Sequence, residues 1–294
     1  MTELDVLCVG HACWDLAFRV SHHPAADEKL FAEGFVSCGG GPAANAAVAA
    51  ARLGCKTGFA GYLGNDPWGD LHIREFEREG VCLDLLNRGT APTPLAAVLV
   101  KPDGTRAVVN SKGDDRFLPA DAMDLSGVSP KVILFDGHEP LLSPGLALAA
   151  KKRGIPTVLD AGSVHAGTRA LAGKVDFLVC SERFSCEWTD QSDPSAAAGR
   201  LAGLAQSVVV TLGSRGLVWK HRDGAGSMPA FRVDAVDTTG AGDVFHGVFA
   251  AGIAKTWAWE KILKFASAAA ALTCVKFGSR PGIPTLEEVR TFLG

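Results

Sequence analysis

The chain has 294 residues, of which 47% are hydrophobic and 21% are charged, so it can bury a core of ordinary size. The formal net charge of −3 argues against a basic surface for nucleic acid, and no apolar run is long enough to span a bilayer. The first residues are acidic where an export signal would be basic, so we expect a cytoplasmic protein. The eight cysteines are scattered without a CxxC pair, which predicts buried free thiols and no cysteine metal site.

Short apolar runs of strand length alternate with small-residue helical runs along most of the chain. Nearly continuous apolar strands between helices indicate a parallel sheet that is covered on both faces. The sequence therefore predicts an α/β fold with a doubly wound, mainly parallel sheet, whose ligands bind beyond the carboxyl ends of the strands. In chain order, we expect strands at 4–9, 57–61, 132–135, 156–160, 176–180 and 208–212, and helices at 42–53, 68–79, 144–153, 194–205, 257–275 and 286–293.

Two segments interrupt this alternation. Residues 15–20 and 30–37 both have the composition of strands, and a polar loop separates them. Residues 95–101 and 107–111 are typical of a hairpin, because a Pro-Asp-Gly-Thr turn joins them. We therefore expect additional strands outside the main parallel sheet.

The most informative stretch is Asp-Thr-Thr-Gly-Ala-Gly-Asp at residues 237–243, which is followed by an apolar run that predicts a helix. Backbone N–H groups at a helix start have no partners within the helix and lie at the positive end of its dipole, so they favour an anion. Glycines allow an oxyanion to approach the main chain, and Asp243 follows at once. An anion cradle beside a base is what phosphoryl transfer to a hydroxyl requires. The alternative is a turn before a buried helix, with Asp243 merely complementing the dipole.

This stretch resembles the second signature of the ribokinase-like (PfkB) family of carbohydrate kinases. The resemblance implies that Asp243 takes the proton from a substrate hydroxyl. It also implies that the amides of Gly240, Ala241 and Gly242 stabilise the transferring phosphoryl group. Enzymes of this family carry a small β lid over the sugar, so we expect one domain of residues 1–294 with lid insertions at approximately 12–38 and 92–114.

A second glycine site precedes the first expected helix. Its sequence, Cys-Gly-Gly-Gly-Pro-Ala-Ala-Asn at residues 38–45, resembles the first signature of the same family, which assigns Gly40, Gly41 and Asn45 to the substrate. Asp15 matches the family's sugar-binding aspartate. A dinucleotide fingerprint is the rival interpretation, but such a fingerprint follows the first strand directly, whereas a long polar loop intervenes here. No GxxxxGK[ST] sequence occurs, which excludes a P-loop.

The expected nucleotide side begins at a strand, a glycine turn and a second strand in residues 208–219. This element resembles the family's Thr-x-Gly-x-x-Gly sequence, which assigns Thr211, Gly213 and Gly216 to ATP, although a plain hairpin turn explains the glycines equally well. The resemblance also places Ala271 and Gly278 at a wall of the adenine pocket, where small residues allow a flat ring to lie against the helix.

Metal ligands are less clearly marked. Many relatives have an Asn-x-x-Glu sequence that organises Mg²⁺ through water, and here Ser181 replaces the Asn while Phe184 replaces the Glu. Glu182 remains as the candidate outer-shell contact to Mg²⁺, which needs few protein ligands. Asp237 is the candidate for a monovalent cation such as K⁺, as in some relatives.

The two signatures resemble in particular the sulfofructose kinase branch, whose substrate is 6-deoxy-6-sulfofructose. Lys29 and Asn110 fall where that branch contacts the sulfonate. The branch's anion-binding arginine has no counterpart, and His138 is offered in its place, with Arg116 elsewhere on the expected lid.

Other functions stay open at this point. Ribose, fructose and 2-keto-3-deoxygluconate are alternative substrates, and a nucleoside kinase could stack its base on Trp14. A catalytically silent sugar-binding protein on the same fold is a further alternative, although the retention of Asp243 argues against it. Exposed lid strands have unpaired edges, so we expect a homodimer that forms through the lid.

Overall fold

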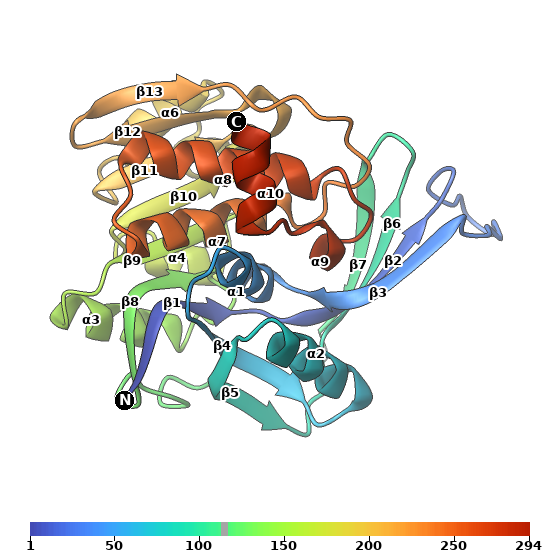
Figure 1. Ribbon diagram of the computed structural model, residues 1–294, viewed down its shortest axis with the longest axis horizontal. Helices are drawn as coiled ribbons and strands as arrows, with labels where there is room; N and C mark the ends of the chain where they lie inside the picture. Colours follow the sequence, from blue (N-terminus) through green and yellow to red (C-terminus); the bar gives the residue numbers. More distant parts are fainter. Residues whose placement is uncertain (113–116) are drawn as a thin grey trace.

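The structure is a computed structural model that describes residues 1–112 and 117–294. A large sheet lies between two groups of helices, and a small sheet projects to one side (Figure 1). The expected α/β class is therefore confirmed. Arg116 and the last two residues of the expected 92–114 insertion lie outside the described residues.

The large sheet is parallel over most of its width. Its strands, in spatial order, are β13 (Gly224–Met228), β12 (Leu217–His221), β11 (Ser207–Thr211), β10 (Phe177–Ser181), β9 (Thr157–Ala161), β8 (Val128–Phe135), β1 (Thr2–Gly10), β4 (Thr57–Gly64) and β5 (Cys82–Gly89). All neighbouring pairs from β11 to β5 are parallel, whereas β12 and β13 join the sheet in antiparallel pairs. The carboxyl ends of the parallel strands consequently meet at one edge, where a doubly wound fold binds its ligands.

Alternate side chains of β1 pack into two separate hydrophobic cores, one on each face of the large sheet. Val6 and Cys8 pack into one core, while Leu7 and Val9 pack into the other, because successive side chains of a strand point to opposite faces. The helices of the first core are α1 (Pro42–Arg52), α2 (Pro67–Arg78), α7 (Ala241–Ala254), α8 (Trp259–Thr273) and α10 (Leu286–Leu293). Those of the second are α3 (Ser143–Lys152), α4 (Ala166–Leu171), α5 (Glu182–Thr189) and α6 (Pro194–Leu201).

The small sheet contains the strands that interrupt the sequence alternation. Its strands, in spatial order, are β3 (Gly34–Gly40), β2 (Cys13–Arg19), β6 (Leu95–Val100) and β7 (Arg106–Ser111). The β2–β3 and β6–β7 pairs are antiparallel, and the central β2–β6 pair is parallel. Since β2 follows β1 after two residues, the small sheet begins at the carboxyl edge of the large one (Figure 1).

One expected strand has the wrong bounds. The sequence predicts a strand at 30–37, but β3 runs from Gly34 to Gly40 and thus includes the first glycines of the signature. Pairing with β2 explains the difference, because Trp14 faces Gly39 and Cys13 faces Gly40 in the register. The glycines are therefore held beside β2 by a strand ladder.

Six elements of the described residues were not predicted from the sequence: β5, β13, α4, α5, α9 (Ser279–Gly282) and the short 3-10 helix Gly213–Arg215. The strand β5 is an edge strand that contains Asp84 and Asn87, and β13 contains two glycines, so neither has the apolar run of a central strand.

Within residues 1–112 and 117–294, no helix combines the length and the apolar character that crossing a bilayer would require.

Helices α1 and α7 pack so closely that their contact depends on a glycine. A methyl group added at Gly247 would lie 2.3 Å from the carbonyl oxygen of Ala46, which is closer than real methyl contacts occur. The first turns of both helices carry signature residues, so this contact sets the separation between the two signatures.

We predict that Gly247→Ala destabilises the protein by about 1–3 kcal/mol, because the added methyl group must push α1 and α7 apart. Thermal and urea unfolding measure the change. Gly199→Ala in α6 is the matched control, since a methyl group there meets no atom within 4 Å and alanine favours the helix. Equal stabilisation by both substitutions would contradict the close contact.

Candidate active site

The Gly-Ala-Gly segment forms the start of α7, as the sequence predicts. Gly240 is the residue before the helix and has a left-handed backbone with φ of 81°, which glycine adopts without strain. The Ala241 amide lies 3.4 Å from the carbonyl oxygen of Thr238, a long hydrogen bond. The Gly242 amide has no acceptor within residues 1–112 and 117–294, and Gly242 is exposed. The helix start therefore offers an N–H group and the positive end of a dipole to an anion.

Asp243 and Asn45 join the two signatures directly. The Asn45 side-chain amide donates a 2.8 Å hydrogen bond to Asp243 Oδ2. Burial raises the pKa of Asp243 to about 6, and the bond from Asn45 opposes this by favouring the carboxylate. Asn45 Oδ1 is buried and has no partner among the described residues, so it can accept a bond from a hydroxyl group. A carboxylate and a free amide oxygen thus lie together.

Asp15 lies against the second glycine site. The Asp15 side chain is buried, and its carboxylate accepts bonds from Ser279 Oγ at 2.9 Å and Cys13 Sγ at 3.2 Å. A methyl group at Gly40 would lie 2.3 Å from the Asp15 carboxylate, so only glycine fits beside it. Gly41 has a φ of 96°, and a methyl group there would lie 2.6 Å from the carbonyl oxygen of His11. Burial raises the pKa of Asp15.

Asp136 closes the same region from the end of β8, although the sequence analysis did not select it. Its carboxylate accepts bonds from the backbone amides of His11, Ala43 and His138. The pKa of Asp136 is low because the His138 charge and these donors outweigh its burial, although burial is the largest single influence. The His138 ring stacks on His11, with ring centroids 5.2 Å apart. The structure therefore places His138 in a carboxylate-histidine group at the strand ends.

A cavity of about 1070 Å³ lies beside the start of α7. Ala241 and Gly242 line it, together with the predicted nucleotide residues Thr211, Gly213, Gly216 and Ala271. Gly278 is not part of the lining; its backbone N–H donates to Asp237 instead. The structure thus brings four of the five predicted nucleotide residues to one cavity that reaches the start of α7.

The two candidate metal residues both have protein partners. Glu182 lies in the first turn of α5 at the edge of the cavity and forms an ion pair with Arg215. Asp237 is 1% exposed, and its carboxylate accepts bonds from the amide and hydroxyl of Thr239 as well as from Gly278. These bonds hold the loop before α7 in place.

The two remaining substrate candidates lie in the small sheet or in the loop next to it. Lys29 is exposed in the loop before β3, and its ammonium lies 6.0 Å from the centre of the Phe31 ring. Asn110 is exposed in β7. Within the described residues, neither forms a hydrogen bond or an ion pair with Asp15, Asn45 or Asp243.

Sequence reasoning also missed Arg106, Asp160 and His246. Arg106 donates a 2.7 Å bond to Thr238 Oγ1 and thereby reaches the segment before the cradle from β7. His246 lies 3.1 Å from Asp160, which sits near the end of β9. The position of an acid at a strand end was the available signal for Asp160, as it was for Asp136.

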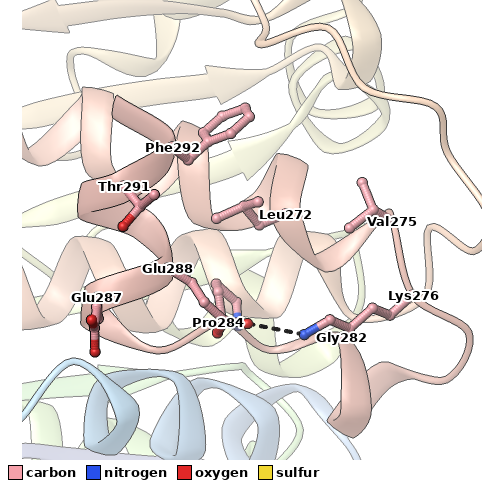
Figure 2. Close-up of a pocket in the computed structure, with 9 residues that line it drawn as sticks. All are labelled: Leu272, Val275, Lys276, Gly282, Pro284, Glu287, Glu288, Thr291 and Phe292. Carbon is pink, nitrogen blue, oxygen red and sulfur yellow. Dashed lines mark hydrogen bonds and ion pairs between the residues drawn. The ribbon is translucent and has the colours of Figure 1, made fainter. Parts of the chain in front are cut away.

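A second, smaller hollow of about 450 Å³ lies between α8 and α10 (Figure 2). Leu272 and Phe292 line it, and a 3.1 Å ion pair between Lys276 and Glu288 crosses its lower side. It contains none of the predicted site residues, so the larger cavity is the candidate nucleotide site.

Comparison with known proteins agrees with this geometry. The profile of the pfkB family carbohydrate kinases matches residues 3–286. A ribokinase from Lactococcus lactis subsp. lactis is 30% identical over 301 residues, covering 100% of this chain and 97% of the relative. An ATP-dependent ribose-1-phosphate kinase from Halopiger xanaduensis is 32% identical over 311 residues, covering 98% and 97%. The structure of Arabidopsis thaliana ribokinase complexed with ribose and ATP has a TM-score of 0.84 and 26% identity, covering 100% and 99% of the two chains. The chain therefore belongs to the ribokinase-like pfkB family of carbohydrate kinases.

Proposed function

We propose that this protein is an ATP-dependent kinase that transfers the γ-phosphoryl group to a sugar hydroxyl. One observation carries the proposal: the start of α7 is shared by two ligand regions. Ala241 and Gly242 line the large cavity, while Asp243 bonds to Asn45 on the side of Asp15. A phosphoryl group at the cradle would therefore lie between a nucleotide and a hydroxyl held by the acidic residues.

In the proposed mechanism, Asp243 accepts the proton of the attacking hydroxyl. The Gly240, Ala241 and Gly242 segment receives the negative phosphoryl group with its amides and the helix dipole. The Asp15 carboxylate and Asn45 Oδ1 orient the sugar, with the close approach that Gly40 and Gly41 allow. Phosphoryl transfer demands little from a base until late in the reaction, so positioning contributes more than basicity.

ATP fits the large cavity, because its glycines permit close approach of phosphates and its Ala271 wall is small. We propose that Mg²⁺ is held mainly by ATP oxygens and water, with Glu182 as an outer-shell contact. Within the described residues, no group of three His, Cys, Asp or Glu side chains is arranged to hold a metal ion. A K⁺ ion at Asp237 would have to share a carboxylate that already accepts three hydrogen bonds, and a K⁺ titration of the rate decides this point.

The acceptor is proposed to be a sugar, in line with the ribokinase, deoxyribokinase and fructokinase relatives. Within this class we retain 6-deoxy-6-sulfofructose as a candidate, with Lys29, Asn110 and His138 toward the sulfonate. His138 lies beside Asp136 and His11, whereas Lys29 and Asn110 are exposed. A nucleoside acceptor has less support, because Trp14 is 4% exposed and packs against Trp68 and His72.

We propose that the small sheet is the lid of a single catalytic domain. It extends from the carboxyl edge where Asp15 and Asn45 lie, and its β6–β7 hairpin reaches Thr238. A lid at this place would exclude water from the phosphoryl group and limit hydrolysis of ATP.

A coupled ADP-release assay over a panel of sugars and nucleosides tests the proposed function. We expect sugar-dependent ADP release, and Asp243→Asn should reduce kcat on the order of 10²–10⁴-fold because the amide cannot accept a proton. Asp70→Asn, an exposed acid in α2, is the control that changes the charge equally. Full turnover in Asp243→Asn would remove that residue from the mechanism, and silence toward every acceptor would favour a binding protein.

The pH dependence of kcat/KM should show the titration of Asp243. Its pKa of about 6 predicts that kcat/KM falls as the pH decreases through this value, because the protonated carboxyl is not a base. Asn45→Ala should move this limb to higher pH, since the hydrogen bond that favours the carboxylate is lost. Asn87→Ala in edge strand β5 is the control. A limb that moves down or stays in place in Asn45→Ala would contradict the assignment.

We also propose a homodimer through the small sheet. Its edge strands β3 and β7 carry exposed apolar side chains, with Phe35 57% and Val109 67% exposed, and unpaired edges favour association. Phe35→Lys combined with Val109→Lys should weaken the dimer in sedimentation velocity. Leu148→Lys, at an exposed position of α3, should not. A monomeric unsubstituted protein at all concentrations would contradict this proposal.

A further inference from the structure

Asp160 and His246 form a buried pair that the mechanism above does not use. Asp160 is 6% exposed in β9, and His246 is 4% exposed in α7, three residues after Asp243. His246 Nδ1 lies 3.1 Å from Asp160 Oδ2. Within residues 1–112 and 117–294, this ring is the sole hydrogen-bonding or ionic partner of the Asp160 carboxyl group.

The surroundings of the His246 ring limit its protonation. Nδ1 also lies 2.5 Å from the carbonyl oxygen of Gly242, and Nε2 lies 3.2 Å from that of Val179. Both nitrogens therefore face oxygen atoms, whereas a neutral imidazole has a single N–H. If the ring were neutral and Asp160 ionised, one ring nitrogen would have no proton although it faces an oxygen acceptor. The buried Asp160 carboxylate would also have no positive charge beside it.

Two arrangements place a proton between the ring and the Asp160 carboxyl group. In one, an imidazolium donates from both nitrogens to the carbonyls and to an ionised Asp160. In the other, a protonated Asp160 donates to Nδ1 of a neutral ring and Nε2 donates to Val179, while the Gly242 carbonyl receives no hydrogen bond from the ring. Burial favours the second arrangement, since it raises the pKa of Asp160 well above its usual range and lowers that of His246 to about 4. Both arrangements hold one proton between the two side chains and have no net charge.

We propose that Asp160 and His246 share one proton across the pH range of activity, and that this neutral pair positions the phosphoryl cradle beside Asp243. The inference rests on the proposed kinase function. Nδ1 of His246 lies against the carbonyl oxygen of Gly242, a residue that lines the large cavity, so the pair contacts the start of α7 directly. Because the pair is neutral, it adds no negative charge beside a site that must accept an anionic phosphoryl group.

Neutrality matters because the site already contains several charges. The carboxyl of Asp160 interacts electrostatically with Asp243 and Asp136. The other groups that act on Asp243 come from β7, α1, β2 and the end of β8, and they are Arg106, Asn45, Asp15 and Asp136. A further uncompensated carboxylate would oppose the binding of the γ-phosphate.

Nuclear magnetic resonance of the ligand-free protein tests proton sharing without any assay of activity. Histidine is labelled with ¹⁵N and aspartate with ¹³C, and His246→Asn and Asp160→Asn identify the signals. At pH 7.5 we expect either two protonated ring nitrogens or a protonated Asp160 carboxyl group. A singly protonated ring beside an ionised Asp160 would overturn the proposal, whatever the enzyme phosphorylates.

The pH profile of kcat separates neutrality from packing. His246→Leu should lose roughly tenfold more activity at pH 8.5 than at pH 6, because Asp160 ionises without a ring to share its proton. The double variant Asp160→Asn with His246→Leu should lose this pH dependence, since its amide cannot ionise. Identical profiles for the single and double variants would show a packing role and contradict the inference. If neither the variants nor the unsubstituted protein has kinase activity, the proposed function fails. The resonance experiment still shows whether Asp160 and His246 share a proton.

Discussion

The hydrogen bond from Asn45 to Asp243 joins the first turns of two helices, and the arrangement of the site depends on it. Helix α1 begins after Gly41 and helix α7 after Gly240, so both begin at a backbone with positive φ. The contact of Gly247 with Ala46 keeps the two helices close enough for this bond to form. A sugar held at the start of α1 and a phosphoryl group held at the start of α7 would therefore be separated by a distance that helix packing determines.

Several carboxyl groups share the interior of this site, and the protein stabilises each in a different way. Asp136 receives backbone N–H groups, and Asp15 receives the hydroxyl of Ser279. Asp160 faces the ring of His246. Asp243 has the amide of Asn45 and a pKa of about 6, so it can change its protonation state near neutral pH. The groups around each carboxyl therefore set different pKa values, and that of Asp243, about 6, lies close to neutral pH.

The sequence predicted the features that depend on local pattern. The glycine-rich stretches predicted the helix starts after Gly41 and Gly240, and apolar runs predicted the central strands, because both signals lie in consecutive residues. Features that depend on distant contacts were missed. The edge strand β5 is too polar to be recognised alone, and the partnership of Asp160 with His246 requires β9 and α7 to meet. Lys29 and Asn110 were suggested by resemblance, and their role stays a prediction; Lys29 is exposed in the loop before β3 and Asn110 is exposed in β7.

The hairpin between β6 and β7 has a mechanical consequence for the reaction centre. Its tip accepts a bond from Thr238 at Gly104, and Arg106 donates to the same hydroxyl, so one threonine fastens the hairpin to the loop before α7. The Arg106 charge also lowers the proton affinity of Asp243. If the hairpin moved away, the Arg106 charge would leave with it and the pKa of Asp243 would rise. The carboxylate would then be a stronger base, but a smaller fraction of the molecules would carry it ionised. The position of the hairpin and the pKa of Asp243 are therefore linked, because Arg106 on the hairpin lowers that pKa.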